Sequence, residues 1–287
     1  MNVLVLGGTR FFGRHLVRQL LADGHAVTIA TRGRTPDDFG DRVRRVTVDR
    51  TNADEMRKTF ANAAFDVVCD NIAYCSNDVR NLLSVVSCGR YVLTSSASVY
   101  EERMDTPESD FDPTHGELIW GDRTAFSYDE GKRQAERAAF LAYPSLPTVA
   151  VRFPYVIGPD DYTRRLAFYV EHIAQGRPMF VDDWDSQLAF VRSDEAGAFL
   201  ARLADADFVG PINGGSVGTI SLREVATYLR EKTGRDALQQ PDGDPGPYNG
   251  GSSFSLDVAR ASERGLHFTP LRKWLFTLLD TLGENIP

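Results

Sequence analysis

Tyr128 and Lys132 are the residues whose types and spacing most directly suggest chemistry in this chain. Because they stand four positions apart in an expected helix, their side chains should share one helix face. A free tyrosine ionises near about pH 10, so proton transfer near neutrality needs roughly 4 kcal/mol of extra phenolate stabilisation. A lysine ammonium about 4 Å away supplies an energy of that order at an effective dielectric near about 20. The pair can therefore act as an acid–base catalyst, although the same spacing is common in solvated surface pairs.

Length, composition and charge narrow the class of protein. The chain has 287 residues, of which 42% are hydrophobic and 25% are charged, as expected for a globular protein with a well-buried core. The formal net charge of -8 at pH 7 argues against broad binding to nucleic acid or to an anionic membrane. We find no apolar run long enough for a signal peptide or a membrane span. These features predict a cytoplasmic enzyme with a small-molecule substrate.

The cysteines and histidines do not suggest a metal site. Cys69, Cys75 and Cys88 lack the paired spacing of metal ligands, and the chain has only 5 histidines. We expect the three cysteines to be reduced thiols that are mostly buried. No step of the predicted chemistry is therefore assigned to a metal.

The first half of the chain alternates short β-branched runs with amphipathic stretches, which is the pattern of repeated β–α–β units. Six parallel strands are expected, at residues 3–6, 26–30, 43–48, 65–69, 91–94 and 148–151. Helices are expected between them, at residues 11–22, 53–60, 78–86 and 126–142. This alternation predicts an α/β fold with a doubly wound parallel sheet of the Rossmann type. The ligand crevice should then lie beyond the carboxyl ends of the strands.

The pattern changes after Pro159, which predicts a smaller C-terminal substrate lobe. The dinucleotide-binding domain is expected at residues 1–158, with a return segment at about 186–204. The substrate lobe is expected at residues 159–185 and 205–287. Further helices are predicted at residues 163–175, 194–203 and 271–282, and a strand at about 188–191. The Ser221–Glu224 spacing is that of a capping box, which should open another helix.

A glycine-rich turn separates the first expected strand from the first expected helix. It reads Gly7-Gly8-Thr9-Arg10-Phe11-Phe12-Gly13. Glycines permit a tight turn and let backbone N–H groups approach a pyrophosphate at the helix N-terminus. The turn therefore predicts dinucleotide binding.

The end of the second strand bears on which dinucleotide is bound. A cofactor without a 2′-phosphate usually meets a carboxylate there, but this chain reads Ala30-Thr31-Arg32-Gly33-Arg34. Arg32, together with Arg10, could hold a 2′-phosphate through paired, charge-assisted hydrogen bonds. We therefore expect NADP. NAD is the alternative, in which Arg32 and Arg34 are solvated loop charges.

Several motifs in this order resemble the extended short-chain dehydrogenase/reductase superfamily, in particular its NAD-dependent epimerase/dehydratase branch. They are the glycine turn, the segment Thr94-Ser95-Ser96-Ala97-Ser98-Val99-Tyr100 and the Tyr128/Lys132 helix. The run Arg152-Phe153-Pro154-Tyr155 is similar to the family's Arg-Pro segment beside the nicotinamide. The resemblance implies that Tyr128 exchanges the substrate proton, that Ser96 hydrogen-bonds the same oxygen and that Lys132 holds the nicotinamide ribose.

The expected contacts of the cofactor and the substrate extend beyond these motifs. Asp49 is a candidate partner for the adenine amino group. The expected cofactor contacts are Gly7, Gly8, Thr9, Arg10, Phe11, Phe12, Gly13, Arg32, Asp49, Asn71, Ala73, Thr94, Lys132, Phe153 and Tyr155. The expected substrate contacts are Ser98, Tyr155, Arg164, Arg165 and Gln187. The segment between Tyr100 and Tyr128, which contains Arg123, is expected along the substrate entrance.

The chain departs from the family pattern at positions that bear on substrate. Arg10 stands where a glycine is usual, so the turn resembles an atypical subgroup that includes chloroplast stem-loop RNA-binding proteins. Glu101 also stands where a glycine is common. Gln187 is at about the place where nucleotide-sugar epimerases often have an arginine for the substrate phosphates. Arg164 and Arg165 could replace that arginine.

We therefore expect an NAD(P)-dependent epimerase or reductase that transfers hydride at a secondary alcohol or ketone of a sugar nucleotide or related metabolite. One alternative is an NADPH-dependent ketoreductase of a small or secondary-metabolite ketone. An alternative of another class is an RNA-binding protein of the chloroplast stem-loop-binding type. Dehydration ranks lowest, because Ala97-Ser98 lacks the additional Asp-Glu pair. Analogy with the family suggests a homodimer.

Overall fold

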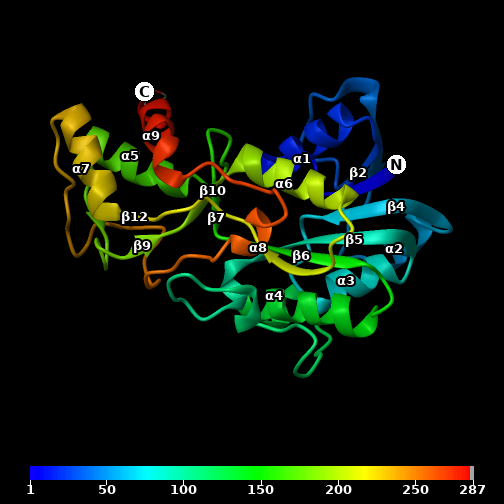
Figure 1. Cartoon of the computed structure of the whole chain (residues 1–287). Helices are drawn as coiled ribbons and strands as arrows, with labels where there is room; N and C mark the ends of the chain where they lie inside the picture. The colour runs from blue at the N-terminus through cyan, green and yellow to red at the C-terminus, as the bar shows by residue number, and fades with distance from the viewer. Residues whose placement is uncertain (285–287) are drawn as a thin grey trace.

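The alternating part of the chain builds most of one parallel sheet in the computed structural model, which describes residues 1–284 (Figure 1). Seven strands lie in the order β11-β6-β5-β4-β1-β2-β3, and every neighbouring pair is parallel. Their bounds are β1 (Asn2–Leu6), β2 (Ala26–Thr31), β3 (Val43–Thr47), β4 (Ala63–Asp70), β5 (Val86–Ser96), β6 (Thr148–Phe153) and β11 (Gly210–Asn213). The doubly wound α/β fold is confirmed.

Helices cover both faces of this sheet (Figure 1). On one face α1 (Phe11–Ala22) packs against α6 (Ser193–Asp205). The other face carries α2 (Ala53–Thr59), α3 (Ser76–Leu83) and α4 (Tyr128–Arg137). The strands divide their side chains between the two faces, because successive residues of a strand point in opposite directions. Val3 and Val5 thus join the α1 side of the core, whereas Leu4 and Leu6 join the α3 side.

A smaller lobe, at the left of Figure 1, lies beyond the carboxyl end of β6, where the first of its short strands follows directly. Its helices are α5 (Arg165–Gln175), α7 (Leu222–Thr233) and α9 (Leu275–Glu284), and α8 (Ala259–Ser262) packs near β11. Short strands complete it: β7 (Tyr155–Ile157), β8 (Met179–Phe180), β9 (Gln187–Leu188), β10 (Phe190–Arg192), β12 (Ile220–Ser221) and β13 (Asp244–Pro245). The predicted capping box at Ser221 and Glu224 is confirmed. Of the described helices, none could cross a membrane.

Some predicted boundaries are wrong, and each error has a local cause. The seventh strand, β11, was not expected, because Gly210 and Pro211 are poor strand formers; an edge position tolerates them. The helix expected at 78–86 ends at Leu83, since Val86 already begins β5. The helix expected at 126–142 is α4 followed by a π-helical turn at Ala138–Ala142.

Three further boundaries differ in the smaller lobe. The strand expected at 188–191 divides into β9 and β10, and the last helix begins after a 3-10 turn at Leu271–Lys273. The segment assigned to the substrate lobe contains β11, which pairs with β6 in the main sheet. The same assignment extends to residues 285–287, which lie outside the described residues.

A buried ion pair joins α4 to the sheet. Arg152 in β6 and Glu136 in α4 have fully buried side chains, and Nη2 lies 2.6 Å from Oε2. The guanidinium also donates to Tyr100 Oη at 2.8 Å and to the carbonyl oxygens of Glu108 and Phe111. A further bond from Nε to Glu136 Oε1 means that all of its N–H groups are used. The pair therefore fixes α4 relative to β6 and the segment after β5.

Glu136→Gln should destabilise the fold, because it removes the charge partner of a fully buried guanidinium. We expect the free energy of unfolding, measured by urea denaturation, to fall by about 3 kcal/mol. Asp54→Asn is the matched control, because Asp54 forms an exposed pair with Arg57 at 2.7 Å. That control should change the free energy by less than about 1 kcal/mol. Equal effects of the two substitutions would contradict the structural role given to Glu136.

Candidate active site

The crevice at the carboxyl ends of the strands begins at the turn between β1 and α1. Gly7 has a φ of 81°, and a Cβ on Gly13 would lie 2.2 Å from the carbonyl oxygen of Gly7. Side chains are therefore excluded at both positions. Within the described chain, no acidic residue lies in the first turn of α1 and no side chain caps it. Its N-terminal N–H groups are thus available to an anionic ligand.

One cavity, of about 750 Å³ and here called the turn cavity, extends from this turn past the ends of β1 to β4. The expected cofactor contacts that line it are Gly7, Thr9, Arg10, Phe11, Phe12, Gly13, Arg32, Asp49 and Asn71. Gly8 lies beneath the turn instead, where an added Cβ would come within 2.8 Å of Val17. Most of the predicted cofactor residues therefore surround one space.

A second cavity, of about 560 Å³ and here called the tyrosine cavity, adjoins the first and reaches α4. The residues that line both cavities are Phe11, Phe12, Asn71, Tyr74, Arg123 and Tyr162. The tyrosine cavity also contains the three predicted catalytic residues, Ser96, Tyr128 and Lys132. Its other expected residues are Thr94, Ser98, Phe153, Tyr155 and Arg165. Residues from β5, α4 and the smaller lobe thus meet in one space.

Lys132 is buried, and backbone carbonyl groups hold its ammonium. Nζ donates to the carbonyl oxygen of Ala73 at 2.8 Å and to that of Thr94 at 2.9 Å. Burial lowers the pKa of this lysine. Two of the three ammonium protons are therefore used, and one is left for a ligand or a neighbouring phenolic oxygen. Ala73 was expected beside the cofactor, but among the described residues it lines neither cavity. Its carbonyl oxygen instead accepts a hydrogen bond from Lys132.

Tyr128 and Ser96 stand on different elements of the tyrosine cavity. Tyr128 begins α4 with 53% of its surface exposed, and its ring centroid lies 6.0 Å from Lys132 Nζ. Ser96 ends β5, and its Oγ accepts a hydrogen bond of 3.1 Å from the N–H of Ser98. The Ser96 hydroxyl can still donate its proton to a ligand. A phenol, a hydroxyl and an ammonium therefore face a common space.

A second buried ion pair fixes the segment that holds Lys132. Asp70 ends β4 with no exposed surface, and it accepts bonds from Arg50 Nη1 at 2.5 Å and Nη2 at 2.9 Å. Tyr91 Oη donates to the same carboxylate at 2.9 Å. Helix α4 packs closely against the next residues, since a Cβ on Gly131 would lie 2.4 Å from the Tyr74 carbonyl oxygen. This close approach brings the Lys132 ammonium within hydrogen-bond distance of the Ala73 carbonyl oxygen.

Two expected substrate residues do not reach either cavity among the described residues. Arg164 lies on the surface, where it pairs with Glu171 in α5. Gln187 lies at the β9–β12 pairing, where its Oε1 accepts a bond of 2.8 Å from Thr219. Their places along the chain predicted a substrate contact, but each side chain instead contacts a local partner in the smaller lobe. Of the two neighbouring arginines, only Arg165 faces the tyrosine cavity.

Tyr74 and Tyr162 lie where the two cavities meet, and neither was expected from the sequence. Tyr74 directly follows the expected Asn71–Ala73 segment, so its position after β4 was the available signal. Tyr162 is in the connection between β7 and α5 and stacks edge-on against Phe11, with ring centroids 6.0 Å apart. No local pattern in the sequence predicts that contact, because it depends on how the smaller lobe meets the sheet.

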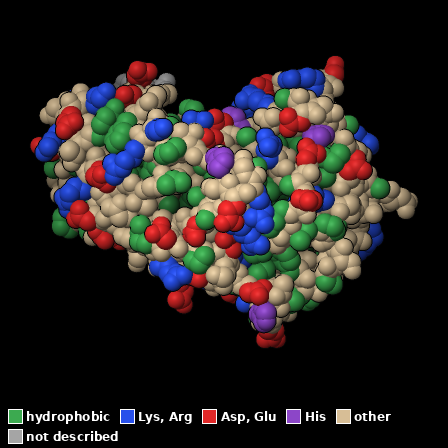
Figure 2. Space-filling model, in the orientation of Figure 1, with side chains coloured by type: hydrophobic (Ala, Val, Ile, Leu, Met, Phe, Trp, Pro, Cys, Tyr) green, Lys and Arg blue, Asp and Glu red, His purple; other side chains and the backbone are tan. Residues whose placement is uncertain are grey.

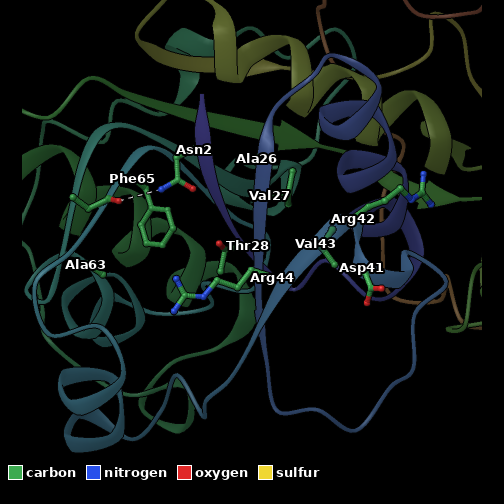
Figure 3. Close-up of a pocket in the computed structure, with 11 residues that line it drawn as sticks. Asn2, Ala26, Val27, Thr28, Asp41, Arg42, Val43, Arg44, Ala63 and Phe65 are labelled. Carbon is green, nitrogen blue, oxygen red and sulfur yellow. Dashed lines mark hydrogen bonds between the residues drawn. The ribbon is translucent and has the colours of Figure 1, made fainter.

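A separate depression lies at the opposite, amino-terminal ends of the strands (Figure 3). Asn2, Val27, Arg44 and Phe65 are among its lining residues, and the Asn2 amide donates to the Ala64 carbonyl oxygen at 3.4 Å. None of the predicted site residues lines it. Ligands of open α/β sheets bind at the carboxyl ends of the strands, so we place the candidate site in the other two cavities.

A known family is similar to the part of the chain that holds most of these residues. The sequence profile of the NAD dependent epimerase/dehydratase family matches residues 3–211. The matched range includes the glycine turn, Ser96 and the Tyr128/Lys132 pair. Most of the residues that line the two cavities therefore lie within the matched range.

Individual relatives are more distant. The chain is 28% identical over 221 residues to chloroplast stem-loop binding protein of 41 kDa b from Arabidopsis thaliana, covering 71% of this chain and 55% of that protein. It is 29% identical over 212 residues to 2'-dehydrokanamycin reductase from Streptomyces kanamyceticus, covering 71% of this chain and 58% of that protein. The chain thus spans somewhat more than half the length of these curated relatives. Thermus thermophilus UDP-glucose 4-epimerase, solved with NAD, has a TM-score of 0.70 at 20% identity and 100% coverage of both chains, which shows the shared fold.

Proposed function

Because the chain belongs to the NAD dependent epimerase/dehydratase family, we propose that it transfers hydride at a secondary alcohol or ketone of a sugar nucleotide or related metabolite. The observation that supports this proposal most is the meeting of Ser96, Tyr128 and Lys132 in a cavity that adjoins the turn cavity. The glycine turn and the free N–H groups of α1 suit the pyrophosphate of a dinucleotide. When bound there, the nicotinamide would supply or accept the hydride.

The three catalytic residues have separate proposed tasks. Tyr128 donates a proton to the substrate oxygen during reduction and accepts it during oxidation. Ser96 Oγ hydrogen-bonds the same oxygen and orients it. Lys132 places a positive charge near the Tyr128 phenolate and uses its remaining N–H to hold the ribose hydroxyls. Its fixed position on two carbonyl oxygens limits the reorganisation that proton transfer requires.

The tyrosine cavity also contains groups that suit a polar substrate. Ser98 Oγ is buried and has no hydrogen-bond partner among the described residues, so a substrate hydroxyl could satisfy it. The Arg165 guanidinium lies over the Tyr155 ring, 5.0 Å from its centroid, with N–H edges available to a phosphate oxygen. Arg123 lines the same cavity. We propose Ser98, Tyr155 and Arg165 as substrate contacts.

One observation favours the alternative of a ketoreductase for a substrate without a diphosphate. Glu101 and Glu102 also line the tyrosine cavity, and their charges oppose a doubly anionic group. The similarity to 2'-dehydrokanamycin reductase supports the same alternative. Cofactor stoichiometry separates the two reactions. A reductase consumes one reduced cofactor per turnover, whereas an epimerase shows no net change in cofactor absorbance.

Tyr128→Phe should lower kcat by at least about 100-fold with a confirmed substrate, because it removes the transferable proton. Dinucleotide affinity, measured by calorimetry, should change by less than about 3-fold, and Ser96→Ala should lower kcat less. Tyr228→Phe is the matched control. Tyr228 has the same spacing to Lys232, but its hydroxyl donates to Asp280 in the smaller lobe. Near-normal turnover of Tyr128→Phe would rule out the assigned mechanism.

We also propose that NADP is preferred to NAD. Arg10, Arg32 and Arg34 line the turn cavity, and Arg10 Nε donates to Thr35 at 2.7 Å. Hydrogen bonds from Thr51 lower the pKa of Asp49, and the nearby charges of Arg32 and Arg34 contribute to the same shift. Asp49 therefore stays ionised near neutrality and can accept a bond from the adenine amino group.

Arg32→Ala should weaken NADPH binding by about 10-fold or more, because charge-assisted hydrogen bonds to the 2′-phosphate would be lost. NADH binding should change by less than about 3-fold, since that cofactor lacks the phosphate. Calorimetric titration with both cofactors measures the difference. Arg57→Ala, on the exposed surface of α2, is the control. An equal loss for both cofactors would contradict NADP selectivity at Arg32.

RNA binding is the alternative of another class, and similarity to a chloroplast stem-loop binding protein supports it. Positive and negative side chains are interspersed on the face shown in Figure 2, with no continuous basic surface there. We expect no retention of a stem-loop RNA in filter-binding assays at physiological salt and micromolar protein. Salt-sensitive binding below about 1 μM would support the RNA-binding class instead.

We propose a cytoplasmic protein, in keeping with the composition described above. We also propose a homodimer, by analogy with the family, through the adjacent helices α3 and α4.

A further inference from the structure

Tyr74 stands where the two cavities meet and contacts two cations there. Its ring centroid lies 4.7 Å from Lys132 Nζ and 4.1 Å from Arg123 Cζ. The same centroid is 6.3 Å from that of Tyr128. An aromatic face attracts a cation at these distances through its quadrupole, most strongly where water is excluded. Tyr74 is therefore an immediate neighbour of both members of the proposed catalytic pair.

The backbone holds the Tyr74 ring in this place. The Tyr74 N–H donates to Asp78 Oδ2 at 2.7 Å, and its carbonyl oxygen lies so close to Gly131 that an added Cβ there would be 2.4 Å away. Burial raises the pKa of the Tyr74 phenol to about 12. The residue therefore remains a neutral phenol near pH 7 and does not compete with Tyr128 for the substrate proton.

We propose that Tyr74 is a positioning residue for Lys132, whose ammonium it holds beside Tyr128 and stabilises in its charged form through the ring face. This inference rests on the proposed function of Tyr128 and Lys132. The ring would act through the lysine and would not itself exchange a proton with the substrate. Tyr74 thus adds a third contact, besides two carbonyl oxygens, to the ammonium.

Other charged groups near Lys132 do not replace this contact. Burial is the main cause that lowers its pKa, and Arg50 lowers it further, while Tyr128, Asp70 and Asp78 raise it. However, both carboxylates are already paired with Arg50, whose Nε lies 3.3 Å from Asp78 Oδ1. Their charges are thus largely compensated before they act on the lysine. Among the described residues, the nearest contacts of the ammonium are the two carbonyl oxygens and the Tyr74 ring, because the Tyr128 ring centroid is farther away, at 6.0 Å.

The test is a titration of the lysines by NMR, in the protein without cofactor or substrate. The chain has four lysines, at positions 58, 132, 232 and 273, so 13Cε-lysine labelling gives few resonances. Lys132→Met assigns the signal of interest. Tyr74→Leu should lower the titration midpoint of Lys132 by about 0.5 to 1 pH unit, because the ring no longer stabilises the cation. Tyr74→Phe keeps the ring and should shift the midpoint by less than about 0.3 units.

A matched control and a series of rings of similar size test whether the shift of the Lys132 midpoint depends on the Tyr74 ring. Tyr228→Leu removes the ring near Lys232, whose Nζ lies 5.2 Å from that centroid, and should leave the Lys132 midpoint unchanged. If Tyr74→Leu does not fold, Tyr74→Phe with progressively fluorinated phenylalanine weakens the quadrupole at nearly constant volume. The midpoint should then fall as fluorine is added. An unchanged or raised midpoint in either experiment would overturn the proposal.

Activity measurements separate this proposal from the proposed function. In Tyr74→Leu the alkaline limb of the kcat/KM profile should move to lower pH by a similar amount, because Lys132 loses its charge earlier. Tyr74→Phe should restore the profile. A shifted Lys132 midpoint with full activity in Tyr128→Phe would reject the reaction and keep the ring contact. An unshifted Lys132 midpoint with an inactive Tyr128→Phe would reject the ring contact and keep the proposed reaction.

Discussion

The buried pair of Arg152 and Glu136 is the constraint on which the geometry of the site depends. Glu136 lies eight residues after Tyr128, so a rigid helix of about 1.5 Å rise per residue transmits its position over roughly 12 Å. Removing two charges from water is costly, and this cost is offset only when every donor and acceptor is paired. The fully used guanidinium therefore permits few arrangements of α4 against β6. The position of the Tyr128 phenol is restricted as well, because Tyr128 begins the same helix.

A second pair, Arg50 and Asp70, stabilises the other segment that holds Lys132. It fixes the end of β4, from which the Ala73 carbonyl reaches the ammonium. Lys132 in α4 thus contacts the segment after β4, whose position is fixed by the Arg50–Asp70 pair and not by α4. The absence of a side chain at Gly131 allows the two elements to approach closely enough for the hydrogen bond. Two ion pairs and one glycine together place a single ammonium.

The sequence predicts the fold well where local patterns decide it, and less well where tertiary contacts decide it. Alternating strands and the glycine turn were sufficient for the Rossmann sheet, whereas β11 was missed because Pro211 obscures an edge strand. The spacing of Tyr128 and Lys132 does not identify a site by itself. Tyr228 and Lys232 repeat it in α7, where both contact Asp280 on the smaller lobe. The position of α4 at the crevice, which the spacing does not reveal, distinguishes the first pair from the second.

The way in which Lys132 is held has a consequence for its charge. A carboxylate hydrogen-bonded to the ammonium would stabilise it, but its negative charge would cancel most of the field that the lysine exerts on the Tyr128 phenolate. Carbonyl oxygens and an aromatic face have no net charge, so they hold the cation while leaving its field largely intact. The carboxylates of Asp70 and Asp78 are instead paired with Arg50. The arrangement thus separates the groups that hold the lysine from the group on which its charge acts.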